Sequence, residues 1–249
     1  MKKPYFSVVI PCLNEEHFLP NLLKNLNSQT FTDFEVIVID GNSDDKTVQV
    51  TKEFKSKYPL FLYSTTTRSV AFQRNLGAKK TKGEVIIFFD ADTQIPKNYL
   101  QKIADTFKNK RPHFLTTYLK VSSNKPLEKI YASFSNLIFE IGKISQSGYS
   151  YGSMQAVKRS VFWDVGGYDS KTSFGEDGQL FGKLLQHNYK YLILKTPRYI
   201  FSMRRFEANG AFKPLLQQLQ INADIFVHGF HSKLGKKYQM GGKHYLSTK

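Results

Sequence analysis

Four short apolar segments, separated from one another by helix-like segments, constrain the fold of this chain more than any other feature. They occupy residues 7–11, 35–40, 60–63 and 84–89. Each is apolar throughout rather than at alternate positions, which is typical of strands that are buried on both faces of a sheet. Because buried strands that alternate with helices form parallel sheets, the sequence predicts an α/β fold with a mostly parallel sheet flanked by helices.

The second half of the chain is less regular. Apolar spacing there predicts helices at 97–107, 126–142, 176–187 and 214–230, and strands at 113–121, 154–157 and 191–195. The segment 113–121 alternates between apolar and polar residues, so we expect it to form an exposed strand. The last helix is expected to belong to a C-terminal appendage that follows one compact unit.

Three polar loops follow the predicted strands and contain groups that bind nucleotides or metals: Pro11–Glu16, Asp40–Asp45 and Asp90–Thr93. In parallel α/β sheets, ligands bind beyond the carboxyl ends of the strands. The position of the three loops agrees with this rule and is the first sign of a site. Two of the loop residues have a simpler interpretation, since Asn14 and Ser43 are each placed to cap the helix that follows.

Asp90 and Asp92 flank one small residue at the end of an apolar strand. Side chains two residues apart on an extended segment point the same way, so both carboxylates can reach one hard cation. Magnesium or manganese at this position would bridge two phosphates and neutralise charge on a leaving diphosphate. Asp40 also ends a buried strand, where an acid can accept hydrogen bonds from a base or ribose. Helix capping is the alternative role for Asp40.

An acidic pair and a basic pair in the second half are candidates for proton removal and for diphosphate binding. Glu176 and Asp177 open a helix, where ionised carboxylates complement the positive end of the helix dipole. The functional alternative is that one of the two removes a proton from an acceptor hydroxyl. Arg204 and Arg205 follow a strand, and guanidinium groups match the oxygens of a diphosphate. The alternative is that both are surface arginines.

The net charge of +16 predicts attraction to polyanions or to an anionic membrane surface. Excess lysine that keeps the protein soluble is the alternative explanation. Nucleic acid is not an expected partner, because the sequence has no zinc spacing, RNA-binding aromatic signature or recognition helix. No apolar run is long enough to span a bilayer, and a single cysteine, Cys12, suits a reducing cytoplasm. We therefore expect a cytoplasmic protein that attaches peripherally to the inner face of the membrane.

Four sequence blocks together resemble a known family. They read SVVIPCLNEE at 7–16, IVIDGNSDDKT at 37–47, RNLGA at 74–78 and FDADT at 89–93. Their order and spacing are similar to those of family-2 glycosyltransferases with the GT-A fold, which is a Rossmann-type arrangement. The resemblance implies a glycosyltransferase domain at 5–205, with a nucleotide-binding half at about 5–122 and an acceptor half at about 123–205. An amphipathic helix and a basic tail follow at 206–249.

The resemblance implies donor-side roles for seven residues. Pro11, Asn14 and Glu15 belong to the strand and loop that line the nucleotide pocket. Asp40 is similar to the acid that contacts the donor base, and Arg74 to an arginine near the nucleotide. Asp90 is similar to the first acid of an Asp-X-Asp element, which lies beside the donor phosphates and the metal. Arg205 is expected to contact the diphosphate.

Further implied roles concern the metal and the acceptor. Asp92, with Asp90, is expected to bind Mg²⁺ or Mn²⁺, and Asp92 is the more direct ligand. Gly167 and Glu176 resemble parts of the acceptor-side signature, in which Asp177 is similar to the catalytic base.

The resemblance implies a metal-dependent inverting glycosyltransferase. Its donor would be a nucleoside-diphosphate sugar, with UDP or GDP, and its acceptor a carbohydrate or a lipid-linked molecule that presents a hydroxyl or a phosphate. Cell-envelope polysaccharide, glycolipid and glycoprotein synthesis are the processes that it suggests. One alternative is a nucleotidyltransferase, although the loop after the first strand has neither the glycine nor the basic residue that such enzymes use. The other is a non-catalytic nucleotide-sugar-binding module at the membrane surface.

Overall fold

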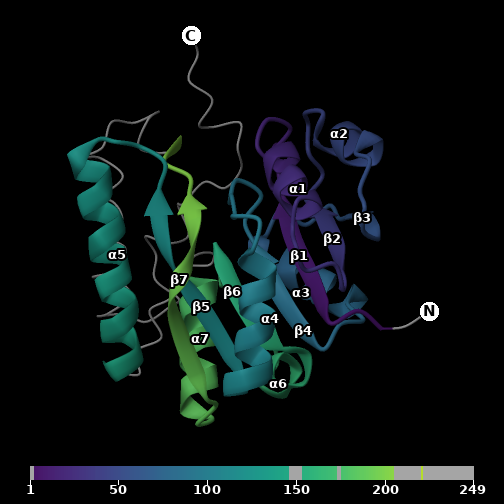
Figure 1. Cartoon of the computed structure of the whole chain (residues 1–249). Coiled ribbons are helices and arrows are strands. Elements are labelled where there is room, and N and C mark those ends of the chain that lie inside the picture. Colours follow the sequence, from purple (N-terminus) through teal and green to yellow (C-terminus); the bar gives the residue numbers. More distant parts are fainter. Residues whose placement is uncertain (1–2, 146–152, 173–174, 205–219, 221–249) are drawn as a thin grey trace.

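The computed structural model describes residues 3–145, 153–172, 175–204 and 220, and its centre is one seven-stranded sheet (Figure 1). The strand order is β3-β2-β1-β4-β6-β5-β7. The strands are β1 (Phe6–Cys12), β2 (Phe34–Asp40), β3 (Leu60–Ser64), β4 (Val85–Phe89), β5 (Phe114–Val121), β6 (Met154–Lys158) and β7 (Tyr191–Phe201). Only β6 runs antiparallel to its neighbours, β4 and β5. The predicted α/β fold with a mostly parallel sheet is therefore confirmed.

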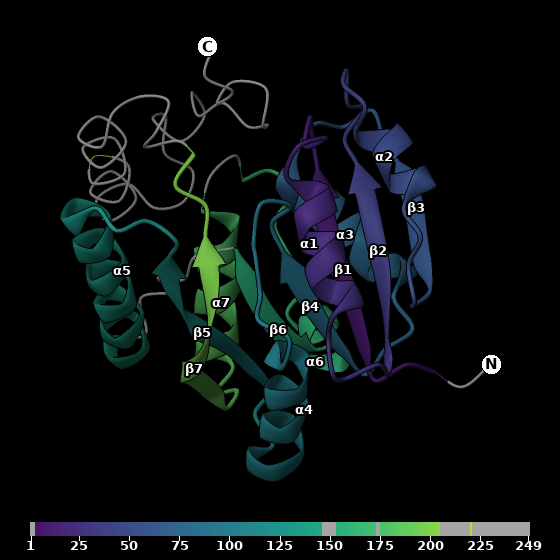
Figure 2. The same ribbon diagram turned by 45° about the horizontal axis from the view of Figure 1, so that its top comes forward.

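Helices cover both faces of the sheet (Figure 2). They are α1 (Leu19–Asn27), α2 (Thr47–Glu53), α3 (Val70–Lys80), α4 (Tyr99–Lys110), α5 (Pro126–Ser145), α6 (Arg159–Asp164) and α7 (Glu176–Gln186). One core cluster joins α1, α4 and α5 to one face of the sheet, and a second joins α3, α6 and α7 to the other. Successive β1 residues Val8 and Val9 belong to opposite clusters, as the alternation of side chains along a strand requires.

The expectation that 113–121 forms an exposed strand is wrong. β5 lies inside the sheet, between β6 and β7, and its first four residues are buried. The threonines that gave the polar positions of this alternation have hydrogen-bond partners inside the protein. Thr116 donates its hydroxyl to the Met154 carbonyl at 2.8 Å, and the Thr117 hydroxyl is hydrogen-bonded to the Tyr99 hydroxyl at 2.6 Å. Buried threonines that have hydrogen-bond partners can therefore produce the alternating pattern that is typical of an exposed strand.

The two predicted helix caps are also wrong. α1 begins after Phe18 and α2 after Lys46, and neither helix has a side-chain hydrogen bond at its N-cap. Asn14 and Ser43 instead hydrogen-bond across the gap between two loops, as described below. Residues that favour helix caps also favour turns, and here contacts between the loops determine their conformation.

Helix α3 packs unusually close to the sheet, and Gly77 permits this. A Cβ atom at Gly77 would lie 2.4 Å from Cγ1 of Val9. The helix begins at a Ser69 cap, whose side chain accepts a hydrogen bond from the Phe72 N–H. Close packing and a fixed start together determine where Arg74, on the same helix, meets the carboxyl edge of the sheet.

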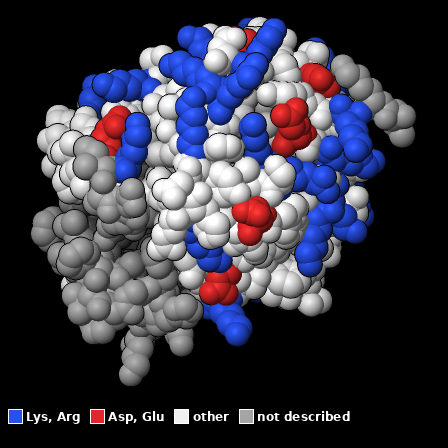
Figure 3. Space-filling model, turned by 90° about the horizontal axis from the view of Figure 1, so that it is seen from below, with Lys and Arg blue, Asp and Glu red and all other residues white. Residues whose placement is uncertain are grey.

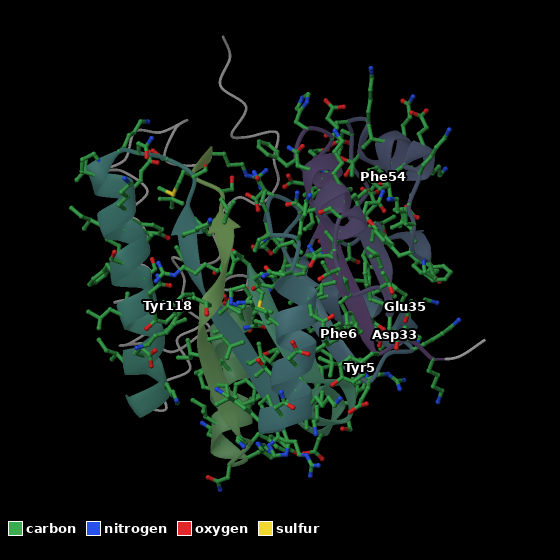
Figure 4. All side chains as sticks on the ribbon, viewed as in Figure 1. Tyr5, Phe6, Asp33, Glu35, Phe54 and Tyr118 are labelled. Atoms are coloured by element: carbon green, nitrogen blue, oxygen red, sulfur yellow. The ribbon has the colours of Figure 1, made fainter. Side chains whose placement is uncertain are left out.

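The surface at the amino edge of the sheet is mainly basic (Figure 3). Figure 4 shows Phe6, Asp33 and Glu35, near the starts of β1 and β2, at the lower end of the sheet. Seen from this amino edge, Lys and Arg predominate over Asp and Glu on the surface (Figure 3).

No helix in the described part of the chain is long and apolar enough to cross a membrane. Apart from residue 220, the predicted helix 214–230 and the predicted appendage at 206–249 lie outside the described residues.

Candidate active site

Loops at the carboxyl ends of β1 and β2 hold each other through Asp40 and Ser43. The Asp40 carboxylate, which is buried, accepts hydrogen bonds from the Ser43 N–H at 3.2 Å and from the Ser43 hydroxyl at 2.5 Å. The Ser43 hydroxyl oxygen accepts a bond from the Asn14 N–H at 2.9 Å, and Asn14 Oδ1 accepts one from the Asp44 N–H at 2.8 Å. Asn14 has a φ of 56°, a left-handed conformation that asparagine tolerates. Pro11 is buried within β1 itself, beside this network.

Glu15 and Asp92 are joined by Arg204, which lies three residues beyond β7. Two nitrogens of Arg204 donate to the two oxygens of Glu15 at 2.6 and 2.8 Å, a bidentate pair. Arg204 Nε lies 3.0 Å from Oδ2 of Asp92. Burial raises the pKa of Glu15 to about 7, although the hydrogen bonds and charge of Arg204 act in the opposite direction. The Arg204 side chain is only 10% exposed and is held by two acids, so the interpretation of this residue as a surface arginine is wrong.

Arg74 joins the β4 end of the site to helix α7. Its guanidinium donates to Oδ1 of Asp90 at 2.8 Å and to Oε1 of Glu176 at 2.8 Å. The Arg74 side chain is only 2% exposed, and it also lies over the Tyr168 ring, 5.3 Å from the ring centroid. A buried guanidinium needs such charged and aromatic partners, because desolvation of an uncompensated cation is costly. Arg74 therefore fixes Glu176 relative to the Asp-X-Asp loop.

Asp177 follows Glu176 in the first turn of α7 and stands beside the same cluster. Its Oδ1 accepts a hydrogen bond from the Gly178 N–H at 2.9 Å, and its backbone carbonyl accepts one from the Gln155 amide at 3.3 Å. Burial, followed by repulsion from the Glu176 carboxylate, raises the pKa of the Asp177 carboxyl. A carboxyl whose pKa moves towards neutrality is better suited to accept a proton in catalysis than an ordinary one.

Gly167 and Tyr168 form the turn that supports this side of the site. Gly167 has a φ of 67°, and a Cβ atom there would lie 2.8 Å from Oδ1 of Asn75. The Asn75 side chain is hydrogen-bonded to both the N–H and the carbonyl of Tyr168, at 3.0 and 2.7 Å. The Tyr168 hydroxyl donates to the Gln155 side chain at 2.6 Å. The turn thus ties α3, which carries Asn75, to β6, which carries Gln155.

Asp90 and Asp92 offer carboxylate oxygens, the type of donor that a hard divalent cation prefers. One oxygen of each carboxylate lies in an ion pair with an arginine: Oδ1 of Asp90 with Arg74, and Oδ2 of Asp92 with Arg204. Within the described residues, no group of three or more His, Cys, Asp or Glu side chains is arranged to hold an ion alone. Mg²⁺ is commonly held by only one or two carboxylates together with substrate phosphates, so two acids are a sufficient protein contribution.

Sequence reasoning found most of this cluster but missed three features. It did not foresee that Arg74 pairs with Glu176, that Arg204 joins Glu15 to Asp92, or that Gln155 supports Asp177. Arg205, the residue predicted to contact the diphosphate, lies outside the described residues. The two adjacent arginines were a usable signal, but nothing local in the sequence shows that Arg204 pairs with Glu15 and Asp92.

Comparisons with known proteins agree with this geometry. The family described as glycosyl transferase family 2 matches residues 7–166, so the chain belongs to this family. A poly(ribitol-phosphate) β-N-acetylglucosaminyltransferase TarS from Staphylococcus aureus is 36% identical over 103 residues, which cover 40% of this chain and 18% of TarS. A 4,4'-diaponeurosporenoate glycosyltransferase from Staphylococcus haemolyticus is 28% identical over 224 residues, which cover 85% of this chain and 59% of that enzyme. The chain therefore spans less than two thirds of these relatives.

Solved structures confirm the GT-A-like fold. Residues 1–349 of S. aureus TarS, in complex with UDP-GlcNAc, superpose with a TM-score of 0.64 at 21% identity, covering 80% of this chain and 57% of that one. The mannosyltransferase PcManGT from Pyrobaculum calidifontis, in complex with GDP-Man and Mn²⁺, superposes with a TM-score of 0.71 at 16% identity. This match covers 98% of this chain and 68% of that chain.

Proposed function

We propose that the chain transfers a sugar from a nucleoside-diphosphate sugar to an acceptor, with inversion of configuration at the anomeric carbon. The observation that carries the proposal is the convergence of acids from both halves of the chain on two arginines, of which Arg74 is buried and Arg204 is largely buried. Arg74 pairs with Asp90 and Glu176, and Arg204 pairs with Glu15 and Asp92. Family membership supports a glycosyltransferase over the nucleotidyltransferase alternative.

The donor is proposed to bind across the loops of β1, β2 and β4. Asp40 would contact the base, the loop with Asn14 and Glu15 would line the pocket, and Arg74 would lie near the phosphates. Two structural neighbours hold UDP-GlcNAc and GDP-Man, which supports UDP or GDP as the carrier. Arg204 is a second candidate for the diphosphate, because its guanidinium already lies between Glu15 and Asp92.

Asp92 and Asp90 would hold Mg²⁺ or Mn²⁺ in the proposed enzyme. The ion would supply positive charge to stabilise the departing nucleoside diphosphate. The Mn²⁺ in one structural neighbour supports this choice of ion.

Asp177 is the proposed base. Its carboxylate would remove the proton of an acceptor hydroxyl as the acceptor oxygen attacks the anomeric carbon from the face opposite the leaving diphosphate. The C–O bond to the diphosphate breaks as the new glycosidic bond forms, so a single displacement inverts the configuration. A phosphate acceptor would already be ionised and would need no such base. The raised pKa and the position of Asp177 beside the Asp90–Arg74–Glu176 cluster support the assignment.

The acceptor is proposed to be a carbohydrate or a lipid-linked molecule of the cell envelope. Similar proteins include a poly(ribitol-phosphate) transferase and a minor teichoic acid biosynthesis protein, GgaB, from Bacillus subtilis. We propose peripheral attachment to the cytoplasmic face of an anionic membrane, supported by the net charge of +16.

The proposal is tested by nucleotide binding and turnover. A thermal-shift screen of UDP, GDP and CMP, with and without Mn²⁺, should give the largest increase in melting temperature for the donor nucleotide with metal. Release of that nucleoside diphosphate from its sugar is then measured for wild type and for Asp92→Asn. We expect the variant to fold but to lose about 100-fold or more of its rate.

Asp105→Asn is the matched control, because Asp105 is an exposed aspartate on α4, away from the site. Its rate should equal that of wild type. If no nucleotide shifts the melting temperature and no nucleotide sugar is turned over, the enzymatic proposal fails. Binding without turnover would instead support the non-catalytic module.

A further inference from the structure

Helix α5 presents a continuous apolar stripe to solvent. Six large hydrophobic side chains of the described residues are more than a third exposed, and all except Phe61 lie on this helix. The five are Leu127, Ile130, Phe134, Leu137 and Ile141, with exposures from 45% to 68%. Their spacing alternates between three and four residues, so they form one row along the helix. Contiguous exposed apolar surface of this kind marks an interaction site rather than ordinary scatter.

The orientation of α5 is fixed by its opposite face, which packs against β5 and β7. Asn136 both donates to and accepts from the backbone of Leu119, at 3.0 and 2.9 Å. Tyr118, which lies between the sheet and α5 in Figure 4, donates its hydroxyl to Glu140 at 2.8 Å. Phe139 is fully buried in the main core. Rotation of the helix to hide the stripe would break these bonds and expose Phe139.

The exposed charges around the stripe have one sign. The exposed charged residues on or next to α5 are Lys125, Lys129 and Lys143. Of the two acids of the helix, Glu128 is buried and pairs with Lys125 at 3.5 Å, and Glu140 accepts a hydrogen bond from Tyr118. An apolar row with a lysine rim is complementary to an anionic lipid surface. A second copy of the chain is a poorer match, because an isologous pairing of α5 would bring lysines together.

We infer that the outer face of α5 is the surface by which the protein rests on an anionic bilayer. This inference deepens the proposed peripheral attachment and rests on it. The helix would lie in the plane of the interface with its apolar row among the acyl chains, since it is neither apolar nor uncharged enough to span.

The position of α5 suits a lipid-linked acceptor. The helix begins five residues after β5 ends, at the carboxyl edge of the sheet, where Asp90 and Asp177 lie. On its inner face, Tyr131 packs against Met203, the residue before Arg204. A bilayer against α5 would therefore lie close to the segment that leads from β7 to Arg204, at the carboxyl edge of the sheet.

Flotation with vesicles tests the inference. The probes are phosphatidylcholine vesicles with and without phosphatidylglycerol, each at low and high salt. We expect wild type to float with the anionic vesicles and to lose binding at high salt or without the anionic lipid. The double variant Ile130→Gln/Leu137→Gln should bind vesicles at least about tenfold more weakly. Each of the two apolar side chains contributes to the free energy of binding by the area that it buries among the acyl chains. Lys129→Gln/Lys143→Gln should weaken binding only to the anionic vesicles.

Phe61→Gln is the matched control, since Phe61 is exposed by 37% on β3 and is not part of the stripe. It should float as wild type does. Thermal melting and nucleotide-sugar turnover with a soluble acceptor or water should be unchanged in all these variants, which separates this inference from the proposed enzymatic activity.

Three results would overturn the inference. If wild type does not float, membrane attachment itself is wrong. If wild type floats but the α5 variants float equally, attachment occurs elsewhere, and the basic amino edge in Figure 3 becomes the candidate. If the chain dimerises in solution and the α5 variants abolish dimerisation without changing flotation, the stripe binds a second copy.

Discussion

The two halves of the sheet build their parts of the site in different ways. In the half that contains β1 to β4, polar groups are fixed by loops that lie next to one another, as in the bonds of Asp40 with Ser43 and of Ser43 with Asn14. In the other half, Glu176 and Arg204 reach the site through long-range ion pairs. Glu176 pairs with Arg74, 102 residues earlier in the chain, and Arg204 pairs with Asp92 and with Glu15, which lies 189 residues earlier.

The difference teaches that the proposed donor pocket is organised locally, whereas the proposed chemical groups depend on tertiary structure. Arg74 and Arg204 are the two links between these regions. Arg74 reaches from the first half to α7, and Arg204 reaches from beyond β7 back to the first half. Changes to the acceptor half should therefore affect turnover, and changes to the links should affect stability and donor binding.

The largest effect is expected for Asp177→Asn. Loss of the proposed base should lower kcat by about 10²–10⁴-fold, while KM for the donor changes little. Glu176→Gln is the informative comparison, because Glu176 pairs with Arg74 and should contribute more to stability than to kcat. Steady-state kinetics and thermal melts of both variants separate the two roles. A larger loss of kcat in Glu176→Gln would reverse the assignment of the base.

The raised pKa of Asp177 predicts that activity and stability depend on pH. The Asp177 pKa is raised in the folded state, and only the ionised carboxylate can accept a proton, so activity should be lost as pH falls through a pKa above the ordinary carboxyl range. The contribution to stability has the opposite sign: it is present at low pH, where both states hold the proton, and is lost as pH rises through the raised pKa. Initial rates and melting temperatures across the pH range test both. An acid limb at an ordinary carboxyl pKa would contradict the role of Asp177.

The next largest effect concerns the stability that Arg74 provides. Arg74→Met should lower the free energy of unfolding by about 3–5 kcal/mol, because it leaves the buried Glu176 without its charged partner. The matched control is Arg68→Met, since the Arg68–Asp44 pair is about half exposed and should contribute about 1 kcal/mol or less. Urea unfolding of the two variants measures the difference. Equal destabilisation would mean that Arg74 does not connect the two halves energetically.

The smallest of these effects is expected for Arg204→Lys. A lysine keeps the charge but loses the planar fork, so KM for the donor should rise by about tenfold with a smaller change in kcat. Arg198→Lys is the control, because Arg198 is exposed on β7 and lies over the Tyr118 ring. An unchanged KM in Arg204→Lys would exclude Arg204 as a diphosphate contact.

Local signals in the sequence predicted the fold well and the site in part. Apolar runs located β1 to β4, and the Asp-X-Asp block located Asp90 and Asp92 at a strand end, because both depend on neighbouring residues. The caps at Asn14 and Ser43 were predicted wrongly, since their partners lie about 30 residues away in another loop. The buried β5 was predicted as exposed because its threonines have internal partners. No local pattern could pair Arg74 with Glu176.

The β4–β6 ladder has a mechanical consequence. Five consecutive residues of β4, from Val85 to Phe89, pair with β6, so hydrogen bonds of the backbone join the two halves into one continuous sheet. A hinge rotation of one half against the other would have to break this ladder, unlike closure in enzymes whose domains meet at a flexible linker. Conformational changes that accompany catalytic cycles of this protein are therefore expected in segments beyond the strand ends, while the sheet stays rigid.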